Sequence, residues 1–183
     1  AKHHEGQFIL RIEDTDLERS DKKYEKDIIE GLQWLDLDWD EGPTGPSTGG
    51  QLIINQYKGD FGPYRQTERA AIYEKYLKKL IENGSAYYCY CSREELEEER
   101  QAMLTQGLPP KYSGRCRQGK PASAGAAQLI RFRVPNSNIS FRDMIRGEIS
   151  FDAGLIGDIA IAKDLKTPLY NIAVVIDDHE MNI

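Results

Sequence analysis

Apolar residues recur along the chain with two spacings, and each spacing predicts one kind of element. Over 20–35 and 67–83 they recur every three or four positions, which is typical of helices that bury one face, and a third helix is expected over 92–107. Ser92 followed by Glu95 adds a capping-box pattern at the start of the third helix. The faces expected to point inward carry Tyr24, Ile28, Leu32 and Leu35 in the first helix, and Tyr73, Tyr76, Leu77, Leu80 and Ile81 in the second.

Shorter apolar runs predict strands. Such runs occupy 7–12, 129–134, 148–151 and 159–162, and the second of them alternates apolar and charged residues with period two. The run 172–176 is apolar throughout, which is typical of a fully buried strand in a parallel sheet. Together the elements predict an α/β half-domain, an inserted α+β module, and a return to the first sheet at the end of the chain.

Glycine and proline mark the connections between these elements. Four Gly-Pro or Gly-Gly pairs fall within 40–63, which predicts a long loop there, and 119–127 has the composition of a linker. A parallel sheet needs crossover helices on its faces, and neither end of the chain supplies one. We therefore expect further elements before residue 1 and after residue 183, so that this chain is a fragment.

Composition narrows the class of protein. The 183 residues include 24 Lys and Arg against 30 Asp and Glu, a net charge of −6, with 39% hydrophobic residues, a balance suited to a folded protein. No apolar run approaches the roughly 20 residues needed to cross a bilayer, and the chain does not open with a secretory signal. Three cysteines cannot all pair within one chain, so we expect reduced cytoplasmic thiols or metal ligands.

The acidic total argues against bulk electrostatic capture of nucleic acid, although it leaves room for a local basic face. Arginines that alternate on strands are able to form such a phosphate-facing patch, whereas a charge count of this kind more often describes an ordinary surface. The basic residues around the inserted module are Arg115, Arg117, Lys120, Arg131, Arg133, Arg142 and Arg146.

Acidic residues follow the first predicted strand directly. Glu13, Asp14 and Asp16 come just after Arg11, at the end of a strand, which is where open α/β sheets bind ligands. A carboxylate at that position is able to hold a substrate ammonium group. The alternative is an acidic turn whose side chains cap backbone groups.

The three cysteines cluster in the sequence and are candidate metal ligands. Cys89 and Cys91 form a C-x-C pair, and Cys116 follows 25 residues later. Zinc prefers four tetrahedral ligands, and the Tyr112 phenolate, four residues before Cys116, is a candidate for the fourth. Gln118 stands where a C-x-H pattern would place a histidine, and its amide oxygen is a poor zinc ligand. The alternative is three reduced thiols packed as small apolar groups.

A second acidic group, Asp177, Asp178 and His179, follows the predicted buried strand. Consecutive residues on a strand point in alternate directions, so these three side chains are not expected to converge on one ion. We interpret them as the wall of a pocket or as polar residues at the end of a sheet.

Four collinear segments carry a family resemblance: FILRIEDTD at 8–16, WDEGP at 39–43, GPYRQTER at 62–69 and PLYNIAVVIDDH at 168–179. Together they resemble bacterial-type glutamyl-tRNA synthetase, a class I aminoacyl-tRNA synthetase, over the whole chain. Glu13 stands where the glutaminyl and archaeal-type relatives usually have aspartate, which favours the bacterial type.

The resemblance implies a fold and a reaction. Residues 1–84 would form the first part of a Rossmann-like nucleotide-binding domain without its N-terminal strand and ATP signature. Residues 85–166 would form an inserted acceptor-stem-binding module with a zinc knuckle, and 167–183 the return strand. The reaction would be ligation of glutamate to tRNA(Glu) for protein synthesis, through attack of glutamate on the α-phosphate of ATP. ATP and Mg²⁺ would serve the full enzyme, and no catalytic residue is expected within this chain.

The resemblance also assigns individual residues. Glu13 matches the acid that holds the substrate α-ammonium, and Tyr170 matches a tyrosine near the glutamate side-chain carboxylate. We expect the two to converge beside neighbouring parallel strands. Arg19 resembles a position near the tRNA acceptor stem. The residues that resemble the zinc knuckle of some members are Cys89, Cys91, Tyr112 and Cys116.

Two other functions fit parts of the pattern. One is a short paralogue that glutamylates a modified tRNA base, and the other is a non-catalytic, zinc-stabilised tRNA-binding module. The sequence departs from the family at Leu165, at Leu169 and in a longer stretch at 44–60. We expect a cytoplasmic protein that does not bind membranes and is a monomer. Zinc occupancy and discrimination between tRNA(Glu) and tRNA(Gln) do not follow from the sequence.

Overall fold

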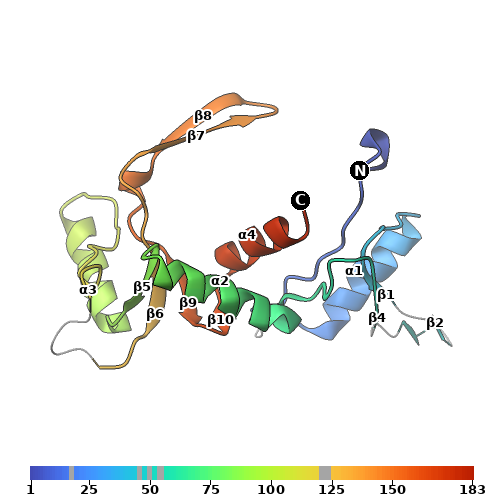
Figure 1. Cartoon of the computed structure of the whole chain (residues 1–183), viewed down its shortest axis with the longest axis horizontal. Helices are drawn as coiled ribbons and strands as arrows, with labels where there is room; N and C mark the ends of the chain where they lie inside the picture. The colour runs from blue at the N-terminus through green and yellow to red at the C-terminus, as the bar shows by residue number, and fades with distance from the viewer. Residues whose placement is uncertain (17–18, 45–46, 49–50, 53–55, 120–124) are drawn as a thin grey trace. The chain divides into compact units, whose positions relative to one another are not determined.

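The computed structural model describes residues 1–16, 19–44, 47–48, 51–52, 56–119 and 125–183. The chain divides into two compact units (Figure 1). Unit 1 comprises Ala1–Tyr73 and Tyr170–Ile183, and unit 2 comprises Glu74–Leu169. Among the described residues, no helix is both long and apolar enough to span a membrane.

The helices agree with the predicted ones except at the end of the chain. They are α1 (Lys22–Trp34), α2 (Ala70–Glu82, after a 3₁₀ turn at Gln66–Arg69), α3 (Arg93–Thr105) and α4 (Tyr170–Glu180), with further 3₁₀ turns at Lys2–His4 and Ala153–Leu155. The capping box of α3 is present, because the Ser92 hydroxyl accepts from the Glu95 amide and the Glu95 carboxylate accepts from the Ser92 amide. The predictions of three helices are therefore confirmed.

The buried face of α1 differs from the predicted one. Ile29 and Glu25 are buried, whereas Tyr24 and Ile28 remain about half exposed. The Arg65 guanidinium donates to both oxygens of Glu25, and this ion pair fixes the helix with that carboxylate inward. The apolar pattern alone did not reveal a buried charge pair.

The segment expected to be the first strand is extended but irregular. It makes two isolated parallel bridges, from Ile9 to Glu41 and from Ile12 to Arg65. The amides of Leu10 and Ile12 donate to carbonyls of those neighbouring segments at 2.8 Å. The prediction of a regular strand over 7–12 is therefore wrong, although the segment does run parallel to its neighbours.

The stretch 40–63 contains short strands where a loop was predicted. β1 (Gly42–Thr44) pairs antiparallel with β4 (Gln56–Lys58), and β2 (Ser47–Thr48) pairs with β3 (Gln51–Leu52). Residues 45–46, 49–50 and 53–55 lie outside the described residues. The turn after β4 needs glycine at position 59, because φ is +100° and a Cβ there would overlap with the side chains of Glu41 and Tyr64.

The apolar run 172–176 is helical, so the prediction of a return strand there is wrong. Helix α4 buries Ala173, Ile176 and Asp177, a spacing of three to four residues. A short, wholly apolar run does not distinguish a buried strand from a buried helix turn, and here the helix occurs. The strand that precedes it, β10 (Thr167–Pro168), contains two residues.

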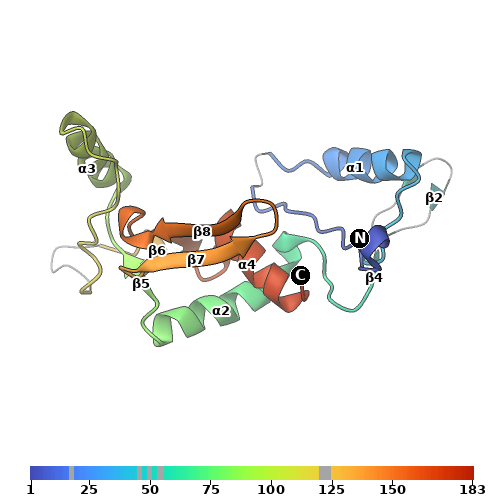
Figure 2. The same cartoon turned by 90° about the horizontal axis from the view of Figure 1, so that it is seen from above.

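Unit 2 is built on an antiparallel sheet. Its order is β10-β9-β6-β5, with β5 (Ala86–Cys89), β6 (Leu129–Phe132) and β9 (Ala160–Asp164). A separate hairpin pairs β7 (Asn138–Asp143) with β8 (Gly147–Asp152), and both views show it as a long two-stranded arm (Figures 1 and 2). The predicted strands near 129–134, 148–151 and 159–162 are confirmed, and β5 and β7 are additional.

Candidate functional site

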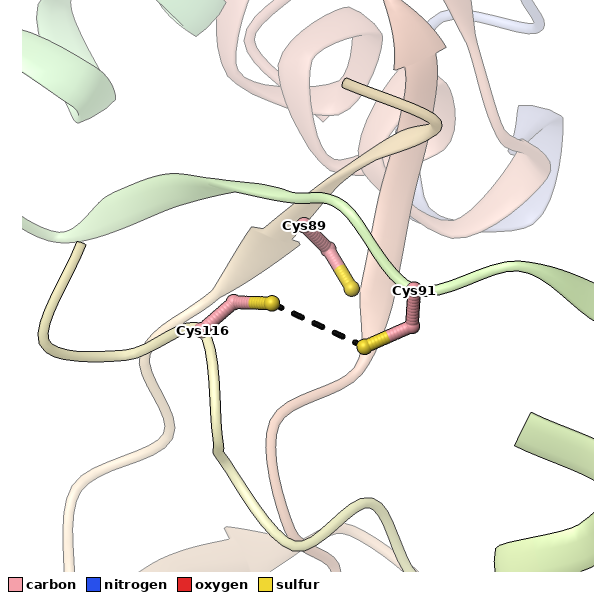
Figure 3. Close-up of side chains that lie close together, drawn as sticks. All are labelled: Cys89, Cys91 and Cys116. Carbon is pink, nitrogen blue, oxygen red and sulfur yellow. Dashed lines mark hydrogen bonds between the residues drawn. The ribbon is translucent and has the colours of Figure 1, made fainter. Parts of the chain in front are cut away.

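The three thiols converge in unit 2, as the sequence predicted. The sulfur atoms of Cys89, Cys91 and Cys116 all lie within 4.8 Å of one another (Figure 3). Cys89 ends β5, Cys91 follows it by two residues, and Cys116 comes from the turn after Gly114. All three side chains are buried.

Tyr112 completes a four-atom group with the thiols. Its hydroxyl lies 3.6 Å from the Cys89 sulfur and 3.5 Å from the Cys91 sulfur, and it accepts the Cys116 amide at 3.0 Å. Gln118 is exposed and takes no part in the group. The Tyr112 hydroxyl therefore lies beside the thiols, and its role as a fourth metal ligand stays a prediction.

Three of the distances within this group are close to those of a tetrahedral centre. Zinc bonds of about 2.3 Å to sulfur and about 2.0 Å to oxygen place ligand sulfurs roughly 3.8 Å apart and sulfur and oxygen roughly 3.5 Å apart. The Cys91 and Cys116 sulfurs lie 3.6 Å apart, and the Tyr112 hydroxyl lies at 3.5 and 3.6 Å from its two sulfurs. The residues present thus fit a small tetrahedral metal ion.

Donor groups surround the thiols. The Tyr90 amide donates to the Cys116 sulfur at 3.4 Å, and Arg115 Nε donates to the Cys91 sulfur at 3.2 Å. The Arg131 guanidinium stacks over the Tyr112 ring, with its central carbon 3.8 Å from the ring centroid. Positive and polar donors of this kind stabilise thiolates and phenolates, the forms that bind metal.

The pKa values reflect the balance between burial and these donors. Burial raises the pKa of the Cys91 thiol, and it also raises the pKa of the Tyr112 phenol. Burial would raise the pKa of Cys89 as well, but hydrogen bonds from Arg131 and the local backbone bring it below its ordinary value. The Cys89 thiol therefore loses its proton more easily than the Cys91 thiol.

The acidic segment after the first extended stretch lines a cleft in unit 1. This cleft has a volume of about 950 Å³ and lies between that segment and the start of α1; Arg11, Glu13 and Arg19 are among its lining residues. The Glu13 side chain is 33% exposed, and its Oε1 accepts from Arg11 at 3.1 Å. Asp14 instead accepts from the Thr67 amide and hydroxyl, so its role is to cap the next turn.

The structure brings Glu13 and Arg19 to one cleft, but Tyr170 is not among its lining residues. Tyr170 is the first residue of α4 and is 56% exposed, so it begins a helix rather than lying beside a parallel strand. Arg19 is 85% exposed, and its Nε pairs with Asp16 at 2.6 Å. Convergence of Glu13 and Tyr170 stays a prediction.

The Asp177 side chain makes buried hydrogen bonds that could not be inferred from the sequence. Its carboxylate is fully buried and accepts three kinds of hydrogen bond. The donors are Arg69 Nε at 2.6 Å, the Tyr73 hydroxyl at 2.9 Å and the side-chain amide of Gln66 at 2.9 Å. The neighbouring Asp178 accepts from Arg11 at 2.7 Å. Asp177 and Asp178 belong to an acidic group that is visible in the sequence. Their arginine partners, however, lie more than 100 residues away along the chain.

Three of the basic residues around the inserted module bond to groups of unit 2. Arg117 pairs with Asp158 at 3.1 Å, Arg131 donates to the Asp158 carbonyl, and Arg133 donates to the carbonyls of Gly84 and Arg117. These three guanidinium groups therefore stabilise unit 2 itself. Arg142 and Arg146 are exposed on or beside the hairpin, and Lys120 lies outside the described residues.

Comparison with known proteins gives one consistent result. The family model described as tRNA synthetases class I (E and Q), catalytic domain, matches residues 1–183. Glutamate–tRNA ligases from Desulforamulus reducens and Natranaerobius thermophilus are each 46% identical over the whole chain, which spans 37% and 36% of their lengths.

Solved structures agree with the sequence matches. A glutamate tRNA ligase from Elizabethkingia meningosepticum, crystallised in complex with its amino acid, superposes with a TM-score of 0.80 at 31% identity. It covers all of this chain, and the chain covers 37% of it. The mixed helix and sheet architecture is thus the α/β fold that the resemblance implied, and the chain belongs to the family of class I tRNA synthetase catalytic domains for glutamate and glutamine.

Proposed function

We propose that this chain is the amino-acid- and acceptor-binding part of a glutamate–tRNA ligase. The observation that carries the proposal is the Glu13 carboxylate at the cleft of unit 1, within a chain 46% identical to enzymes with that name. Its Oε1 is held by Arg11, and among the described residues no donor contacts Oε2. That oxygen is available to a substrate ammonium group.

The reaction needs positioning more than covalent chemistry by the protein. The glutamate carboxylate attacks the α-phosphate of ATP and pyrophosphate leaves, which gives glutamyl adenylate. A hydroxyl of the terminal ribose of tRNA then attacks the glutamyl carbonyl carbon, and AMP leaves. Holding the α-ammonium at Glu13 would orient the attacking carboxylate, and Tyr170 would contact the side-chain carboxylate of the same substrate. No residue of this chain is assigned to ATP or Mg²⁺.

The contact with tRNA is assigned to Arg19. Its guanidinium is largely exposed beside the cleft, where a phosphate of the acceptor strand can reach it. The predicted acceptor-binding module at 85–166 would fall within unit 2, which comprises Glu74–Leu169.

The test is glutamate-dependent exchange of pyrophosphate into ATP by the protein encoded by the complete reading frame. Glu13→Gln should raise the KM for glutamate by at least about tenfold, because it removes a charge-assisted hydrogen bond to the ammonium. Asp38→Asn, at an exposed ion pair with Lys58, is the matched control and should leave KM unchanged. Exchange with glutamine rather than glutamate would contradict the proposed substrate.

We propose further that Cys89, Cys91, Tyr112 and Cys116 bind a structural Zn²⁺ ion. The support is that three buried sulfurs lie within 4.8 Å of one another and that the Tyr112 hydroxyl lies 3.5 and 3.6 Å from two of them. A bound ion would join β5 to the turn that holds Cys116. Metal analysis of the purified protein should give one Zn²⁺ per chain, and Cys116→Ser should lower that content.

A further inference from the structure

Arg11 joins two acidic side chains that lie far apart in the sequence. Its Nη2 donates to Glu13 Oε1 at 3.1 Å, and its Nη1 donates to Asp178 Oδ1 at 2.7 Å. The Arg11 side chain is only 12% exposed, whereas the Glu13 and Asp178 side chains are 33% and 41% exposed. The guanidinium is therefore a mostly covered link between the cleft of unit 1 and helix α4.

The backbone on both sides of Arg11 is held in place. The Leu10 amide donates to the Glu41 carbonyl and the Ile12 amide to the Tyr64 carbonyl, each at 2.8 Å. The Ile12 carbonyl accepts the Gln66 amide at 3.0 Å. These hydrogen bonds fix the backbone on both sides of Arg11 and so limit the space that its side chain can occupy.

The other end of the link is equally well anchored. Asp177, next to Asp178 on α4, accepts hydrogen bonds from the buried side chains of Arg69, Gln66 and Tyr73. Arg11 Nε also lies 3.8 Å from Asp177 Oδ2. Asp178 thus projects from a helix whose position is fixed by a buried ion pair.

We infer that Arg11 is a positioning residue for the amino-acid substrate, which holds the Glu13 carboxylate in one orientation by joining it to Asp178 of α4. The inference rests on the proposed role of Glu13. The planar fork of arginine can bind two carboxylates in fixed directions, which a lysine ammonium cannot do. With Oε1 held, Oε2 is presented to the ammonium before the substrate arrives, and little side-chain entropy is lost on binding.

The test uses the protein from the complete reading frame and measures kcat and KM for glutamate separately in pyrophosphate exchange. Arg11→Met should raise the glutamate KM about tenfold, while kcat changes by less than about threefold, since the link acts on binding. Arg11→Lys should recover part of this loss because it keeps the charge. Asp178→Asn should raise KM by a smaller factor and add little to Arg11→Met, as expected for two residues of one link.

Controls separate this inference from the proposal on which it depends. If Glu13→Gln raises KM and Arg11→Met does not, the positioning role is wrong and the role of Glu13 stands. If Glu13→Gln leaves KM unchanged, the assignment of Glu13 is wrong and the inference falls with it. If Arg11→Met unfolds the protein, the glutamate KM of Asp178→Asn tests the inference instead. The Asp178 side chain is 41% exposed, so this substitution should leave the fold intact. An additive double variant would also overturn the inference.

Discussion

The Arg69 guanidinium and the Asp177 carboxylate form an ion pair in which Nε and Oδ1 lie 2.6 Å apart and both side chains are almost completely buried, at 1% and 0% exposed. The pair connects the 3₁₀ turn before α2 to helix α4, which are separated by more than 100 residues. Hydrogen bonds from Tyr73 and Gln66 complete the shell around the carboxylate. The two segments of unit 1 are thereby joined at their centre.

We expect Asp177→Asn to destabilise the protein strongly. The amide would leave the buried Arg69 charge without a counter-ion, and breaking a buried pair in this way costs about 3–5 kcal/mol. Urea unfolding followed by circular dichroism would measure the loss. Asp38→Asn, which removes an exposed partner of Lys58, should change little. Equal losses of stability in the two variants would show that the contribution of the Asp177 ion pair to stability does not depend on its burial.

Gly59→Ala should be more harmful than Gly84→Ala. Both glycines have positive φ, at +100° and +76°, so alanine is strained at each by roughly 1–2 kcal/mol. Only at Gly59 would the new Cβ overlap with Glu41 and Tyr64, which adds roughly 1–3 kcal/mol of overpacking. The difference between the unfolding midpoints of the two variants measures the destabilisation caused by the crowded Cβ at position 59. Equal midpoints would contradict the close approach described here.

Tyr112→Phe should weaken Zn²⁺ binding and leave the three sulfurs in place. Loss of one ligand should lower the affinity by at least about tenfold, measured by competition with a chromogenic chelator. Affinity for Zn²⁺ should also rise with pH, because the thiols and the phenol must lose protons to bind. Tyr88→Phe, on β5 beside Cys89, is the matched control and should bind like the unmodified protein. Unchanged affinity in Tyr112→Phe would indicate a different fourth ligand.

Stability should fall in alkaline solution, and Tyr64 should contribute to that fall. Burial and the hydrogen bond to Glu41 raise the pKa of Tyr64 to about 12, above its unfolded value near 10. The folded state therefore keeps a proton that the unfolded state releases, and the stabilisation is lost as pH rises from 10 through 12. Urea unfolding from pH 8 upward should show a shallower decline in Tyr64→Phe than in the unmodified protein.

Local patterns predicted the elements whose signals lie within one segment. Helix α3 followed from the Ser92 and Glu95 capping box, and the buried thiol cluster followed from three cysteines within 28 residues. Helix α4 was mistaken for a strand because its apolar run is too short to display a helical period. The α1 face was misassigned because Glu25 is held inward by Arg65, a residue 40 positions away.

The link from Glu13 through Arg11 to Asp178 was equally hidden. Both acids stood in recognised motifs, but nothing local indicates that one guanidinium would contact both, since 167 residues separate Arg11 from Asp178. Long-range pairing of charged groups depends on how the backbone segments are brought together. The acidic segment that lines the cleft could be located from the sequence, whereas the contacts of Arg11 with Glu13 and Asp178 could not.

Strand β5 is the outermost strand of the sheet in unit 2 and contains only four residues. Beyond Cys89 the chain continues to Cys91, whose sulfur lies 3.6 Å from that of Cys116, so the thiol group stands where the edge would otherwise continue. Short edges offer little template for pairing with another molecule. Association of two chains through β5 would therefore form few backbone hydrogen bonds, whether or not the thiols hold a metal ion.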